Sequence, residues 1–94
     1  MTFWQNAPGA ELLDQGLKDL AANQHSLAAL LVLIGEPRLR RCHVPVPTHK
    51  PLEISPEKLL YSLLILDNPR TAHSAYNGYI RRLVSLEQFL ESQS

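Results

Sequence analysis

The chain has 94 residues, of which 45% are hydrophobic and 19% charged, and nine lysines and arginines balance nine aspartates and glutamates. A chain of this length builds one hydrophobic core, so residues 1–94 are expected to form one domain. Balanced charge gives no general attraction to nucleic acid or to an anionic membrane surface. The single cysteine excludes an internal disulfide and therefore a disulfide-stapled secreted scaffold.

The sequence contains no signal for secretion or membrane insertion. The longest wholly apolar run, residues 27–34, is far shorter than the roughly 20 residues that a membrane-spanning helix needs. The first residues also lack the basic and apolar segments of a signal peptide. We therefore expect a cytoplasmic protein with no membrane partner.

The first helix is predicted over about residues 10–34. Leucines recur at spacings of three and four from Leu13 to Leu31, with only Gln24 interrupting the series, which is the pattern of a helix with one apolar side. Gly35 followed by Pro37 is a typical helix stop, because glycine accepts a left-handed conformation and proline cannot continue the helix.

Two alternatives for this region stay open. In the first, residues 23–26 break the helix and Ser26 caps a second, shorter helix. In the second, residues 27–46 form a β-hairpin that turns at 35–37. Periodicity alone cannot separate strand from helix in a short, wholly apolar run.

The rest of the chain predicts a stiff connector and two more helices. Residues 36–55 contain four prolines, which favour extended backbone. Ser55 and Pro56 are a strong helix start, and the helix over about 56–66 is apolar on nearly every side, which predicts burial on more than one side. A further helix is predicted over about 69–92. The expected fold is a mostly α, small helical domain of three to four helices with a proline-rich connector, the alternative being an α+β domain with the hairpin.

No residue pattern predicts catalysis, a cofactor or a metal. Cys42 and His43 have only His49 nearby, whereas a structural zinc ion needs four ligands at paired short spacings. The ordinary interpretation of Cys42 is a small buried side chain. Glu87 and Glu91 lie four residues apart near the end of the last helix, where we expect both to be exposed and screened by water. We therefore expect no enzyme and no cofactor.

The apolar stripes exceed what a chain of this size easily buries, which favours a non-enzymatic protein-interaction module. It would self-associate or dock as a small adaptor or chaperone-like subunit of a larger assembly. Aromatic side chains dominate the energetics of interfaces, although at helical spacing they more often belong to a core. The residues expected to contact a protein partner or a second copy are Tyr76, Tyr79, Leu83, Leu86 and Trp4.

The alternative function is a small nucleic-acid-binding regulator. Arginine matches a phosphate group as a two-pronged fork, and arginines cluster at two places in the sequence. Against this, a run of charge is usually a solvated face. The residues expected to contact nucleic acid in this alternative are Arg38, Arg40, Arg41, Arg81 and Arg82.

Overall fold

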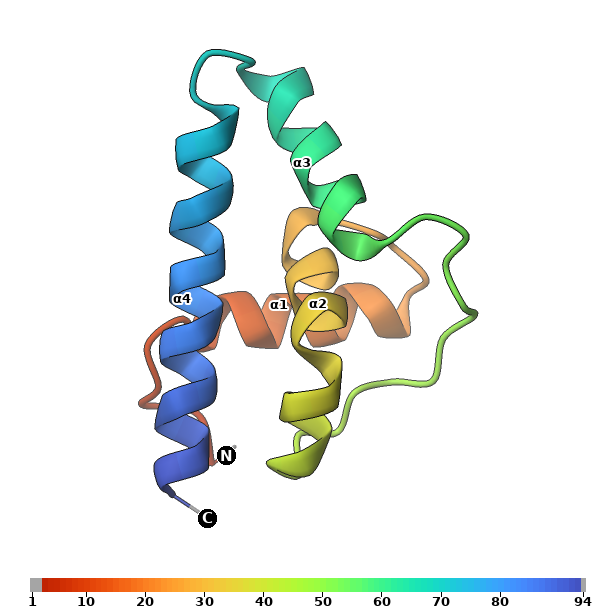
Figure 1. Ribbon diagram of the computed structural model, residues 1–94. Coiled ribbons are helices and arrows are strands. Elements are labelled where there is room, and N and C mark those ends of the chain that lie inside the picture. Colours follow the sequence, from red (N-terminus) through yellow and green to blue (C-terminus); the bar gives the residue numbers. More distant parts are fainter. Residues whose placement is uncertain (1–2, 94) are drawn as a thin grey trace.

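The computed structural model describes residues 3–93, which contain four α-helices and no strand (Figure 1). The helices are α1 (Ala10–Ala21), α2 (Leu27–Arg41), α3 (Pro56–Asp67) and α4 (Ala72–Ser92). In Figure 1, α1 lies across α2 and α4, whereas α3 and the first half of α4 form a hairpin that extends beyond α1. The predicted small helical fold is confirmed. No helix within residues 3–93 is both long and apolar enough to cross a membrane.

The predicted single helix over 10–34 is wrong, because the chain turns between α1 and α2. Asn23 has a left-handed φ of 60°, which asparagine tolerates better than most residues, and α1 ends just before it. Ser26 then accepts a hydrogen bond from the backbone N–H of Ala29 and donates one to the Asp19 carboxylate. The alternative in which Ser26 caps a second helix is therefore what the structure shows.

The predicted helix stop at Gly35 and Pro37 is also wrong, as is the β-hairpin over 27–46, because α2 continues to Arg41. Gly35 is buried where α2 meets α4, and a Cβ there would lie 2.9 Å from Cδ1 of Leu83. This glycine serves close packing and not a left-handed turn. Pro37 is exposed and leaves the helix intact, although it removes one backbone hydrogen bond.

The chain leaves α2 at His43, two residues after Arg41, where φ is +67°. The N–H groups of His43 and Val44 donate back to the carbonyls of Arg40 and Leu39, each at 3.0 Å, and both Val44 and Leu39 are buried. This is the usual glycine-type helix end, made here with a histidine. The extended connector therefore begins after residue 43 and not at residue 36.

Replacing His43 with glycine is expected to raise the free energy of unfolding by about 1 kcal/mol, because glycine adopts a positive φ without steric cost. Urea unfolding of the two proteins measures the difference. The matched control is His73→Gly on the exposed side of α4, where glycine lowers helix propensity and is expected to destabilise. A loss of stability in both variants would contradict the assigned helix end.

The core lies where α2 meets the other helices. The largest fully buried side chains come from α2, α3 and α4 and are Leu30, Leu39, Leu60 and Leu90. α1 packs closely on α2 at Gly16, where a Cβ would lie 2.5 Å from the Ala28 carbonyl oxygen. α3 packs on this core mainly through α2 and α4, and its side with Leu63 and Leu66 is open to solvent.

Candidate protein-contact surface

The outer side of α3 is an exposed apolar face. Leu60 and Leu64 point into the core, with 0% and 7% of their surface exposed. Leu63, Ile65 and Leu66 are exposed, and Leu66 keeps 82% of its surface accessible. The prediction that this helix is buried on more than one side is wrong, because α2 and α4 pack against the same side of it.

Leu63 and Leu66 belong to a stripe that continues to the start of the helix and onto the connector. Leu59, Leu63 and Leu66 follow one another at spacings of four and three, and Leu59 is half-buried against the core. Ile54 is 52% exposed and lines the same open hollow as Leu59 at the start of α3. We call the set Ile54, Leu59, Leu63 and Leu66 the α3 patch; Ile65 is also exposed but, two residues from Leu63, it points to another side of the helix.

Two tyrosines of α4, Tyr76 and Tyr79, lie in the hairpin that α3 forms with α4 (Figure 1). Both are among the residues expected to contact a partner. Tyr76 stacks edge to face on Tyr61 of α3, with ring centroids 5.7 Å apart. Burial and then the charge of Glu57 raise the pKa of Tyr76. The guanidinium carbon of Arg82 lies over the ring of Tyr79, 5.5 Å from the ring centroid. Both tyrosine rings are half-buried, so each retains an exposed edge.

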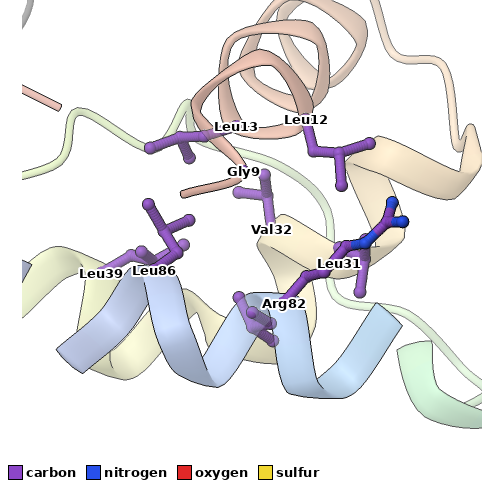
Figure 2. Close-up of a pocket in the computed structure, with 9 residues that line it drawn as sticks. Gly9, Leu12, Leu13, Leu31, Val32, Leu39, Arg82 and Leu86 are labelled. Carbon is purple, nitrogen blue, oxygen red and sulfur yellow. The ribbon is translucent and has the colours of Figure 1, made fainter. Parts of the chain in front are cut away.

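The other predicted contact residues are covered by the chain itself. Leu83 and Leu86 are 7% and 4% exposed and line a narrow apolar cleft between α1, α2 and α4 (Figure 2). The cleft holds about 20 Å³, which is room for about one water and not for a ligand. Trp4 is 4% exposed, and its indole N–H donates to the Asp14 carboxylate at 2.7 Å. The expectation that these three side chains are free to contact a partner does not fit their burial, because Leu83 and Leu86 pack in the cleft against α1 and α2 and Trp4 is covered by the core.

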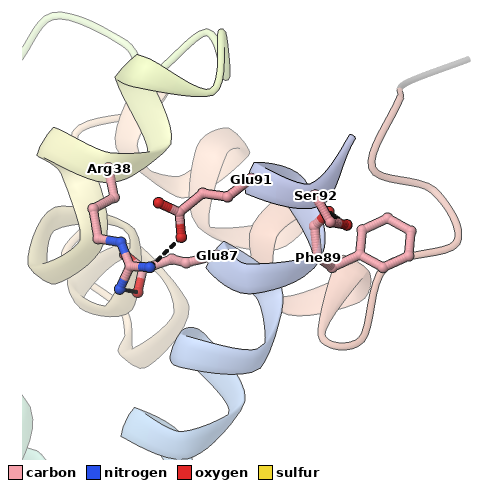
Figure 3. Close-up of polar contacts among 5 residues, drawn as sticks. All are labelled: Arg38, Glu87, Phe89, Glu91 and Ser92. Carbon is pink, nitrogen blue, oxygen red and sulfur yellow. Dashed lines mark hydrogen bonds and ion pairs between the residues drawn. The ribbon is translucent and has the colours of Figure 1, made fainter. Parts of the chain in front are cut away.

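Two arginines of the predicted cluster form ion pairs with glutamates of the same chain. Arg38 donates to Glu87 at 3.1 Å and also pairs with Glu91 (Figure 3). Arg40 pairs with Glu36 at 2.7 Å. Two arginines of the cluster are thus partly neutralised within the chain, which lowers the positive potential available to a phosphate backbone.

The remaining arginines of the nucleic-acid hypothesis are Arg41, Arg81 and Arg82, and all three are exposed. Arg82 borders the apolar cleft of Figure 2 beside Tyr79. Contact with nucleic acid stays a prediction for these residues.

Glu87 is buried and ion-paired, which the sequence did not reveal. It is 4% exposed, so the expectation that it is screened by water is wrong. Burial raises its pKa, while the charge of Arg38 opposes that rise. The pairing of Arg38 with Glu87 spans 49 residues of sequence, and no local pattern signals it. It ties the end of α2 to the last turns of α4.

Neither a group of metal-ligand side chains within residues 3–93 nor a comparison with known proteins adds information about the α3 patch. Among the described residues, no three His, Cys, Asp or Glu side chains are grouped so that they could hold a metal ion. Cys42 is buried at the end of α2. The chain matches no protein-family model, no curated protein and no solved structure.

Proposed function

We propose that this chain is a non-enzymatic protein-interaction module, that the α3 patch is its contact surface, and that a second copy of the chain occupies it. The observation that carries the proposal is the exposure of Leu63 and Leu66, which lie three residues apart and are therefore neighbours on one face of α3. Single exposed leucines are common on protein surfaces, whereas contiguous apolar patches usually mark interaction sites.

Charge supports a second copy as the occupant. The formal net charge of the chain is zero, so two copies do not repel each other at long range. A two-fold contact requires one patch that can pack against itself, and a stripe of leucines along one helix satisfies this condition.

Ser62 supports a close approach of two α3 helices. It is exposed on α3 between Leu59 and Leu66, and its small side chain leaves room for a partner helix. Its hydroxyl already donates to the carbonyl of Lys58 at 2.9 Å, so covering it would strand no donor. Tyr76 lines the same shallow hollow as Ser62, so its exposed edge extends the surface toward α4.

The test is the molar mass in solution, measured by light scattering on a size-exclusion column at low and high salt. Wild-type protein is expected to have twice the mass of one chain at both salts, because apolar contacts are not screened by ions. The double variant Leu63→Glu, Leu66→Glu places charge within the patch and is expected to be monomeric, with an unchanged helical circular dichroism spectrum.

Val84→Glu is the matched control, since Val84 is a 36% exposed apolar residue of α4 outside the α3 patch. This variant is expected to keep the wild-type mass. A monomeric wild-type protein would overturn self-association. So would a double variant that stays folded and keeps the wild-type mass.

A further inference from the structure

The connector between α2 and α3 is held to α2 by a histidine. Nε2 of His49 lies 2.9 Å from Oε1 of Glu36, and Nδ1 lies 3.1 Å from the carbonyl oxygen of Lys50. The side chains of His49 and Glu36 are 18% and 21% exposed, so this contact is largely shielded from solvent.

The neighbours of both ring nitrogens are hydrogen-bond acceptors. A carbonyl oxygen and an ionised carboxylate cannot donate, so each nitrogen needs its own proton. Neutral imidazole carries one N–H and satisfies only one of the two contacts, whereas imidazolium satisfies both. We propose that His49 is a protonation-controlled latch, which fastens the connector to Glu36 when charged and releases it when neutral.

Few polar contacts other than that of His49 hold residues 47–53 of the connector. The preceding residues are anchored by the burial of Val44 and Val46, and the N–H of Val46 donates to the carbonyl of Val44 at 2.9 Å. Among the hydrogen bonds found within residues 3–93, the contact from His49 to Glu36 is the one that joins residues 47–53 to a helix. Release of His49 would therefore free residues 47–51, whereas Leu52 stays packed against the core at the open hollow beside α3.

The surrounding charges favour the protonated latch. The charged groups around His49 are Glu36 and Arg40 of α2 and the adjacent Lys50. The hydrogen bond to Glu36, and then that to the Lys50 carbonyl, raise the pKa of His49, against burial and the charge of Arg40. Burial pushes the pKa of Glu36 upward, but hydrogen bonds from His49 and Arg40 outweigh it, so the net shift is downward.

The direction of the pH effect follows from these shifts. A histidine whose pKa is higher in the latched state stabilises that state fully below its ordinary pKa of 6.5, and this stabilisation is lost as pH rises through the raised value. Glu36 adds its contribution above 4.5, which is lost as pH falls through its lowered pKa. The latch is therefore strongest in weakly acidic solution, between these two limits.

The test is an NMR titration of the full chain between about pH 5 and pH 8, a range that covers the titration of histidine. The imidazole signals of His49 report its protonation, and heteronuclear relaxation of the Thr48, His49 and Lys50 amides reports the motion of the connector. His49 is expected to titrate above 6.5, and amide motion is expected to increase with the same midpoint. Each unit of upward shift corresponds to a tenfold change in the latching equilibrium.

Variants separate the latch from other pH effects. Glu36→Gln removes the charge and is expected to move the His49 midpoint down toward 6.5, whereas His49→Gln is expected to leave the connector equally mobile at every pH. The control is His73→Gln, at an exposed histidine of α4. In this variant His49 is expected to titrate as it does in the wild-type protein. Connector motion that does not depend on pH in the wild-type protein would overturn the proposal, as would pH-dependent motion that persists in His49→Gln.

Discussion

Replacing Gly16 with alanine is expected to lower the free energy of unfolding by about 3 kcal/mol, the upper end of the usual cost of overpacking a core. The new Cβ would lie 2.5 Å from the carbonyl oxygen of Ala28 and 2.5 Å from Cγ2 of Val32. The first of these atoms belongs to the backbone of α2, so a rotamer change cannot relieve the clash. α1 would have to move away from α2, and the apolar contacts between the two helices would be weakened.

Urea unfolding measures this loss, and Gly78→Ala is its matched control. Nothing lies within 4 Å of a Cβ built at Gly78, so alanine there is expected to stabilise α4 by about 0.5–1 kcal/mol through helix propensity. Opposite signs at the two glycines would confirm the close crossing of α1 and α2. Stabilisation at both positions would contradict it.

Replacing Leu60 with alanine is expected to cost about 3 kcal/mol, within the usual range for a fully buried leucine. Leu60 is 0% exposed and packs into the core from α3, which contacts α2 and α4. Its loss would leave a cavity that the surrounding helices cannot easily fill. Since the cavity lies within one chain, this destabilisation should be the same at every protein concentration, as judged by thermal or urea unfolding.

Leu66→Ala on the same helix separates the core of α3 from its contact face. Leu66 is 82% exposed, so its truncation is expected to cost less than about 0.5 kcal/mol in an isolated chain. If the α3 patch joins two copies, Leu66→Ala instead weakens association, and its effect on unfolding depends on protein concentration. Equal, concentration-independent losses from Leu60→Ala and Leu66→Ala would contradict the assigned orientation of α3.

Local signals in the sequence were sufficient for the start of α3, whereas α4 begins at Ala72, three residues after the predicted start at about residue 69. Ser55 accepts a hydrogen bond from the N–H of Lys58 and Pro56 is the first residue of α3, as predicted. These boundaries were predictable because a cap involves residues within three or four positions of one another. The same locality explains why the Ser26 cap was among the alternatives although the longer helix was preferred.

Gly35 shows the limit of such signals. Glycine serves both at the end of a helix and where two helices pack closely, and the residues around it do not distinguish these uses. The approach of α4 decides between them, because Leu83 and Glu87 occupy the space that a side chain at position 35 would need. α2 therefore continues through a sequence that ends many helices.

The apolar stripes were predictable from the sequence, but which of them stays exposed was not. Leu83 and Leu86 do form an apolar stripe on α4, but this chain covers the stripe with its own helices. The exposed apolar surface lies on α3 instead, at Leu63 and Leu66. Periodicity finds an apolar stripe but cannot tell whether the partner that buries it belongs to the same chain.

By itself, the sequence determined the helical class, the start of α3 and the proline-rich character of the connector, because helix propensity, caps and proline act over a few neighbouring residues. Only the tertiary structure decided the path of α2, the burial of Glu87 beside Arg38 and the pairing of His49 with Glu36. Arg38 and Glu87 are separated by 49 positions in the sequence, and Glu36 and His49 by 13. Such contacts depend on how helices pack, and the same packing leaves one side of α3 exposed.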